Sequence, residues 1–118
     1  MWILKGENED MVGYSVSKPD WKLFQERISG WQEAYMEKLC GEYIALLSRD
    51  SNASERFWAL DERIKNDKRN KGVRIRLEKQ NVPYDIVFLI YEGAITQDDI
   101  ADFSDELRER VAYILENL

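Results

Sequence analysis

Apolar residues recur at steps of three and four through the first half of the chain, a spacing that only an α-helix places on one face. This stripe predicts one long helix from about Lys18 to Ser48. Ser17 suits its start, with Pro19 and Asp20 in the first turn, because a serine oxygen and a carboxylate satisfy backbone N–H groups that lack helical partners. The stripe consists of Trp21, Phe24, Ile28, Trp31, Tyr35, Leu39, Tyr43 and Leu46.

A second helix is predicted to open at Asn52, because Glu55 follows three residues later and apolar residues then keep a helical spacing. Its apolar positions are Ala53, Phe57, Leu60 and Ile64. A run of basic residues and then Gly72 indicates where this helix stops. Trp21, Trp31 and Trp58 lie on or beside the apolar stripes, so we expect them in the core rather than on a ligand platform.

The last third of the chain predicts a short buried helix followed by a longer one. The apolar run from Ile86 to Tyr91 fits a helix or a strand, and we favour a helix closed by Gly93. Thr96 and Asp99 form a capping box, which predicts a last helix from Gln97 to about Asn117. Its core stripe consists of Ile100, Phe103, Leu107, Val111 and Ile114, with Ile95 and Ile100 forming a hydrophobic staple.

The predicted fold is therefore mainly α, with three or four helices in a single domain spanning residues 1–118. At most a small β element is expected, formed by the N-terminus and residues 73–77. Residues 1–16 alternate weakly between apolar and polar positions, which fits a short hairpin or an arm, and Val73, Ile75 and Leu77 alternate with arginines.

Composition excludes several classes of function. The 118 residues are 44% hydrophobic and 34% charged, as in a soluble globular domain, and no apolar run approaches the ~20 residues that span a bilayer. We expect a cytoplasmic protein, since the start has no signal-peptide pattern. The chain has one cysteine, Cys40, and no histidine, so it lacks the residues of a disulfide scaffold or a zinc site. We predict no cofactor, no metal and no catalytic residue, and expect Cys40 to be a half-buried small residue.

Charge is unevenly spread around a net value of −6. Residues 63–79 hold eight cationic and two acidic side chains, a net +6, whereas residues 98–118 hold two cationic and seven acidic ones, a net −5. Helix-dipole matching and solvated faces explain such asymmetry most simply. The candidate partner-binding residues are nonetheless the charged ones in these segments: Arg63, Lys68, Arg69, Lys71, Arg74, Arg76, Asp98, Asp102 and Asp105.

Five short motifs resemble those of a family of small uncharacterised bacterial proteins. They are Asp20-Trp21-Lys22-Leu23-Phe24, Trp31-Gln32-Glu33-Ala34-Tyr35-Met36, Phe57-Trp58, Gly93-Ala94-Ile95-Thr96 and Asp102-Phe103-Ser104-Asp105. The resemblance covers about residues 20–115. Members often carry the description "multidrug transporter", which this sequence contradicts because no segment is long and apolar enough to cross a bilayer. The motifs are mainly core and capping residues, so the resemblance implies no particular activity.

These observations favour a non-enzymatic protein that binds another protein, in a regulatory role. Two alternatives stay open: nucleic-acid binding through the basic segment 63–79, and an antidote-type protein that covers a basic toxin with its acidic last helix. The basic segment lacks interleaved aromatic residues, and the helix after Gly93 is acidic, so nucleic acid ranks below a protein partner.

The length of the first helix bears on assembly. Residues 18–48 as a straight helix would span about 46 Å, whereas a compact domain of this size is about 35 Å across. Either the helix bends at Ser29–Gly30, or its end projects and buries Tyr43, Leu46 and Leu47 against a second chain. We favour a homodimer slightly.

Overall fold

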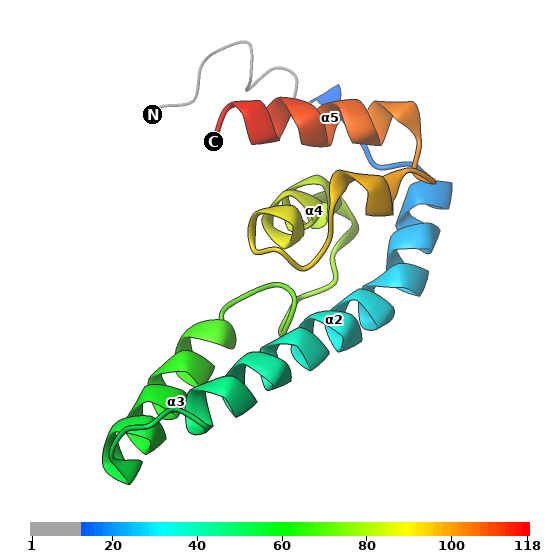
Figure 1. The fold of residues 1–118 in the computed structure, drawn as a ribbon. Helices are drawn as coiled ribbons and strands as arrows, with labels where there is room; N and C mark the ends of the chain where they lie inside the picture. The colour runs from blue at the N-terminus through cyan, green and yellow to red at the C-terminus, as the bar shows by residue number, and fades with distance from the viewer. Residues whose placement is uncertain (1–12) are drawn as a thin grey trace.

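A computed structural model describes residues 13–118, so most of the predicted hairpin or arm over residues 1–16 lies outside the described residues. The described chain is helical (Figure 1). Its elements are α2 (Lys18–Leu47), α3 (Ala53–Asp67), the 3₁₀ turn η1 (Lys79–Asn81), α4 (Val82–Tyr91), the 3₁₀ turn η2 (Gln97–Ile100) and α5 (Asp105–Glu116). The prediction of a mainly α fold with a long first helix is confirmed. None of the helices in residues 13–118 has the length and apolar character needed to cross a membrane.

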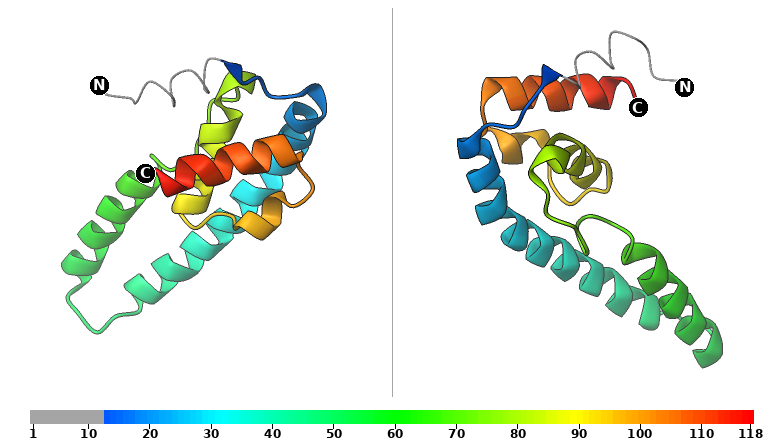
Figure 2. Two further views of the ribbon diagram at one scale, coloured as in Figure 1. Left: turned by 90° about the horizontal axis from the view of Figure 1, so that it is seen from above. Right: turned by 180° about the vertical axis from the view of Figure 1, so that it is seen from behind.

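The core lies at one end of the molecule, which we call the head. There α5 crosses α4, and the first half of α2 runs beside both (Figures 1 and 2). The predicted stripe of the last third is buried as expected, and it meets Phe24 and Ile28 of α2. Trp31 packs against this core with its ring centroid 6.1 Å from that of Phe24 and 6.2 Å from that of Phe103. Trp21 is likewise half-buried at the edge of the core.

The second half of α2 leaves the head and pairs with α3 as a projecting helical hairpin (Figure 2). The radius of gyration is 17.3 Å and the longest dimension is 54 Å, whereas a compact chain of this length has a radius of about 13–14 Å. Of the two alternatives raised by the length of the helix, its end therefore projects. Tyr43 and Leu46 are half-buried in the hairpin, and Leu47 is exposed.

Several capping residues stabilise the helix ends as predicted from the sequence. The Asp20 N–H donates to Ser17 Oγ at 3.2 Å, and the Thr96 N–H donates to Asp99 Oδ2 at 2.7 Å. Gly93 closes α4 with a φ of +85°, a backbone conformation that favours glycine. Ile95 and Ile100, the predicted staple, are both buried.

Three predictions about secondary structure need correction. Residues 73–77 form no strand, because no other described segment runs beside them as a strand. The last helix does not run unbroken from Gln97: the Thr96 cap opens only η2, and α5 begins at Asp105. Ser104 takes an extended backbone and accepts the Leu107 N–H at 3.2 Å, so a second N-cap restarts the helix. This break allows both Ile100 and Phe103 to reach the core.

Gly72 does not cap the second helix, which ends five residues earlier at Asp67. Its role is steric. A β-carbon at Gly72 would lie 2.3 Å from the ring carbon Cδ2 of Tyr35, so only glycine lets this turn approach α2 so closely.

The prediction of a core position for Trp58 is wrong. Trp58 is 64% exposed, and its neighbour Phe57, an apolar position of the predicted helix, is 63% exposed, because α3 packs mainly against α2 and both side chains lie off that contact. Cys40 is exposed rather than half-buried.

The burial of α5 predicts a large effect of core truncation. Leu107 is fully buried, so Leu107→Ala should lower the free energy of unfolding by about 2–5 kcal/mol through lost burial and the cavity left behind. Leu77→Ala, at an exposed position, is the matched control and should change it by less than about 1 kcal/mol. Denaturant titration measures both, and equal midpoints for the two variants would contradict the packing described for α5.

Candidate partner-binding surface

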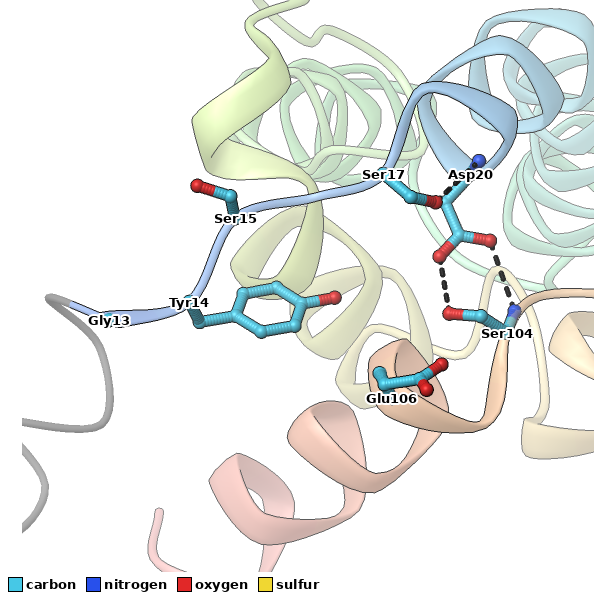
Figure 3. A pocket seen from close by; sticks show the side chains of 7 residues that line it. All are labelled: Gly13, Tyr14, Ser15, Ser17, Asp20, Ser104 and Glu106. Carbon is cyan, nitrogen blue, oxygen red and sulfur yellow. Dashed lines mark hydrogen bonds between the residues drawn. The ribbon is translucent and has the colours of Figure 1, made fainter.

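A buried polar contact in the head joins the starts of α2 and α5. The Asp20 carboxylate lies in the first turn of α2 and accepts the Ser104 N–H at 3.0 Å and the Ser104 hydroxyl at 2.5 Å (Figure 3). Ser104 Oγ in turn caps α5. Two helix starts 84 residues apart in sequence are therefore held by one carboxylate, which we call the clasp.

A shallow pocket opens beside the clasp. It is lined by Gly13, Tyr14, Ser15, Ser17, Asp20, Ser104 and Glu106, and the Tyr14 side chain reaches towards the carboxylates (Figure 3). Burial, and next the charge of Asp20, raise the pKa of Tyr14. The guanidinium of Arg110 lies 4.8 Å from the centre of the Tyr14 ring and holds it against α5.

The clasp does not amount to a catalytic dyad. The Ser104 hydroxyl is already committed to Asp20 and to the cap of α5, and the sequence has no histidine to act as a base between them. Between residues 13 and 118, no three carboxylate or thiol side chains gather in a way that could hold a metal ion. Asp20 and Ser104 therefore join two helix starts.

The predicted basic residues do not form one surface. Three of them are paired with carboxylates of the same chain: Arg63 Nη2 lies 2.6 Å from Glu42 Oε1, Lys71 Nζ 3.3 Å from Asp85 Oδ1, and the exposed Arg76 Nε 2.9 Å from Glu78 Oε1. Lys68, Arg69 and Arg74 are exposed, at the end of α3 and in the turn that follows it.

The predicted acidic residues gather where η2 meets α5. Asp102 Oδ2 lies 2.7 Å from Arg27 Nη2 on α2, and Asp105 pairs with Arg108 one turn further along α5. Asp98 is exposed on η2. Two of the three therefore stabilise local structure, although surface ion pairs contribute little.

Lys71 belongs to a second polar cluster, beneath the turn that follows α3. Its backbone N–H and that of Gly72 donate to the Glu92 carboxylate at 3.0 and 3.2 Å, while its side chain pairs with Asp85 of α4. Asp85 is 2% exposed, and its Oδ2 has no hydrogen-bond partner among the described residues. Burial raises the pKa of Asp85, and the nearby Lys71 ammonium partly offsets that effect.

The α4 helix carries an exposed aromatic stripe, although most of its residues are buried. Tyr84 and Phe88 are each 40% exposed and Tyr91 is 74% exposed. They stand four and three residues apart, so they line one face of the helix. We call this face the α4 stripe. The other seven residues of α4 are buried, apart from the half-buried Ile90.

A second apolar surface lies on the hairpin. Phe57 and Trp58 pack edge to face, with ring centroids 5.0 Å apart. The hairpin itself is held by polar contacts: Tyr43 donates its hydroxyl to Asp67 Oδ2 at 2.5 Å, and Arg63 lies over the Tyr43 ring. Burial and the bond to Asp67 raise the pKa of Tyr43 to about 12.

Sequence analysis did not identify the α4 stripe, and it took Phe57 and Trp58 for core. One signal was available for the pair: adjacent residues lie 100° apart on a helix, so both could not share the stripe through Leu60 and Ile64. No such signal exists for α4. Its residues are apolar around most of the helix, and such a pattern does not reveal which face the rest of the fold leaves exposed.

Comparison with known proteins adds nothing to this geometry. No family model, no curated protein and no solved structure matches the chain. The resemblance drawn from the sequence motifs stays a prediction, and it assigns no residue a role.

The clasp predicts an energetic coupling between two distant residues. Asp20→Ala leaves the Ser104 donors without their acceptor, and it should lower the free energy of unfolding by about 1–3 kcal/mol. In a double-mutant cycle with Ser104→Ala, the coupling energy should be about 0.5–3 kcal/mol. Asp102→Ala, which breaks only a surface ion pair, is the control and should cost less than about 1 kcal/mol. A loss no larger for Asp20→Ala than for this control would contradict the clasp.

The Lys71–Asp85 pair predicts a pH-dependent effect. Burial raises the pKa of Asp85 in the folded state above its unfolded value. Protonated Asp85 therefore contributes fully to stability below the unfolded pKa, and this contribution is lost as pH rises through the folded pKa. Lys71→Met removes the cation that stabilises the charged form of Asp85. It should therefore destabilise the protein by about 2 kcal/mol near pH 7 and by less near pH 4.

Unfolding midpoints measured across this pH range test the prediction. The same Lys71→Met substitution made in an Asp85→Asn background is the control, because an amide does not titrate. There the cost should be small and independent of pH, and a pH dependence that persists in this background would assign the effect to another group.

Proposed function

We propose that this protein is a non-enzymatic interaction module that binds a protein partner through the α4 stripe. The observation that carries the proposal is the exposure of three aromatic side chains at helical spacing on the most buried helix of the head. Aromatic side chains bring large contact area at low entropic cost, and they dominate the binding energy of many interfaces.

The spacing of the stripe suits an amphipathic helix as partner. Tyr84, Phe88 and Tyr91 extend over about 10 Å of helix, and positions i, i+4 and i+7 match the anchors through which an amphipathic helix packs into an apolar surface. Arg74 and Arg76, in the segment that leads into α4, are exposed. They favour a partner helix with acidic residues beside its apolar face.

The two alternatives have less support. Arg63 and Lys71 of the basic segment are engaged with carboxylates, which leaves fewer cations for phosphates. Asp102 and Asp105 are paired with arginines of the same chain, which weakens a toxin-covering role for the acidic end. We place the protein in the cytoplasm as part of the proposal, since the exposed Cys40 thiol stays reduced there.

The proposal is tested by comparing two matched variants as bait in lysate of the native host. Phe88→Ser removes the centre of the α4 stripe, whereas Phe57→Ser removes a phenylalanine that is more exposed but lies on the hairpin. A partner bound stoichiometrically by wild type should be lost by Phe88→Ser, with affinity at least about 30-fold weaker, and retained by Phe57→Ser. Circular dichroism should show both variants to be folded.

Three outcomes would contradict the proposal. Equal capture by wild type and Phe88→Ser would place the interface elsewhere. Loss with Phe57→Ser alone would assign the partner to the hairpin. Retention on heparin that falls steeply with salt, together with nuclease-sensitive capture, would favour the basic segment and nucleic acid.

A further inference from the structure

The α2–α3 hairpin has a mainly apolar side and a more polar side. On α2, Met36, Cys40, Tyr43 and Leu47 follow one another at steps of four and three, so they share a face. On α3, Phe57, Asp61 and Ile64 share a face in the same way, and the Asp61 carboxylate is paired with Lys65 Nζ at 2.9 Å. We call the six apolar residues of this surface the hairpin face. Cys40, Leu47 and Phe57 are exposed, and the other three are half-buried.

The hairpin-face residues of α2 and those of α3 point to the same side of the hairpin. The helices touch through Glu42 and Arg63, and through the Leu47 carbonyl, which accepts from Arg56 Nη1 at 2.8 Å. Each of these contact positions is followed directly by a residue of the hairpin face: Tyr43 follows Glu42, Phe57 follows Arg56, and Ile64 follows Arg63. Because the two helices run antiparallel, a shift of one residue turns the side chains towards the same side on both. The opposite side carries Lys38, Glu55, Glu62 and Asn66, with Ala34, Ala45 and Ala59 among them.

Opposite charges end the two stripes at the base of the hairpin. Glu33 precedes Met36 by three residues and begins the α2 stripe, and Lys68 follows Ile64 by four and ends the α3 stripe. The contacts of Gln32 Nε2 with the Lys71 carbonyl (3.0 Å) and of Tyr35 with Asn70 (2.9 Å) place both ends at one level. Glu33 and Lys68 are exposed, and neither forms an ion pair with a described residue.

We propose that a second copy of this chain covers the hairpin face, with both hairpin tips pointing the same way. A two-fold axis along the hairpin lays α2 of one copy over α3 of the other, so Glu33 of each copy meets Lys68 of the other. The reverse orientation would put Glu33 at the partner's tip, away from that lysine. Charge complementarity therefore selects the parallel arrangement of tips.

The available area sets the strength of this dimer. Helix α3 has 15 residues and is about 22 Å long, and two packed helices are about 20 Å wide, so pairing buries roughly 900 Å² over both copies. Interfaces of that size belong to the weak, reversible class. The dimer thus forms at high concentration, and it leaves the α4 stripe free for another partner.

Analytical ultracentrifugation of the full chain under reducing conditions, from about 10 to 500 µM, tests the proposal. The average mass of wild type should rise from 14.0 kDa towards twice that value. Phe57→Ser should stay monomeric, with association weakened at least about 10-fold, while Phe88→Ser should dimerise as wild type does. Glu33→Lys should weaken the dimer, and Glu33→Lys combined with Lys68→Glu should restore it.

Each other outcome overturns the proposal. A wild type that stays monomeric at the highest concentration removes the second copy from the hairpin face. Dimers formed by Phe57→Ser but not by Phe88→Ser move self-association to the α4 stripe. A charge swap that fails to rescue Glu33→Lys rejects the parallel arrangement. Thermal unfolding at the wild-type temperature establishes that the surface variants are folded, and none of these results bears on partner capture through the α4 stripe.

Discussion

The head of this protein depends on the carboxylate of Asp20. Set in the first turn of α2, it accepts both the backbone N–H and the hydroxyl of Ser104, and Ser104 in turn caps α5. A buried carboxylate is costly unless its oxygens are hydrogen-bonded, and here both oxygens accept a donor from Ser104. The clasp therefore fixes the start of α5 against the start of α2. The space between those helices is where α4 lies.

The position of α4 explains why a candidate binding surface lies at the centre of the fold. Buried by α5 and by the first half of α2, it reads in sequence as apolar on nearly every side. Yet the elements around it leave one face open, and that face carries Tyr84, Phe88 and Tyr91. The exposed part of an aromatic side chain contributes little to folding. Their exposure is the main reason to assign this face to a partner.

The hairpin follows from a mismatch of lengths. The 30 residues of α2 extend beyond a head formed by shorter helices, so its second half packs mainly against α3. The two helices are held largely by polar contacts, among them the Arg63 pairs with Glu42 and Asp67 and the hydroxyl of Tyr43. A pair of helices has two open sides, and in this hairpin one of them is mainly apolar.

Features that depend on residues close in sequence could be predicted from the sequence alone. Helical spacing predicted the extent of α2 and the start of α3, Ser17 predicted the start of α2, and Gly93 predicted the end of α4. The core stripe from Ile100 to Ile114 was also identified correctly, because periodic burial leaves a strong pattern. Each of these depends on contacts within a few turns of one helix.

Tertiary structure decided which apolar residues stay exposed and which charged side chains form ion pairs within the chain. Phe57 and Trp58 look like core residues until α3 is seen to have one neighbour, and Arg63 and Lys71 look like free cations until Glu42 and Asp85 are placed beside them. Asp20 and Ser104 are 84 residues apart, and nothing local in either segment indicates their pairing. Exposure and pairing depend on what lies opposite a side chain in space, whereas the sequence pattern describes only the element to which the side chain belongs.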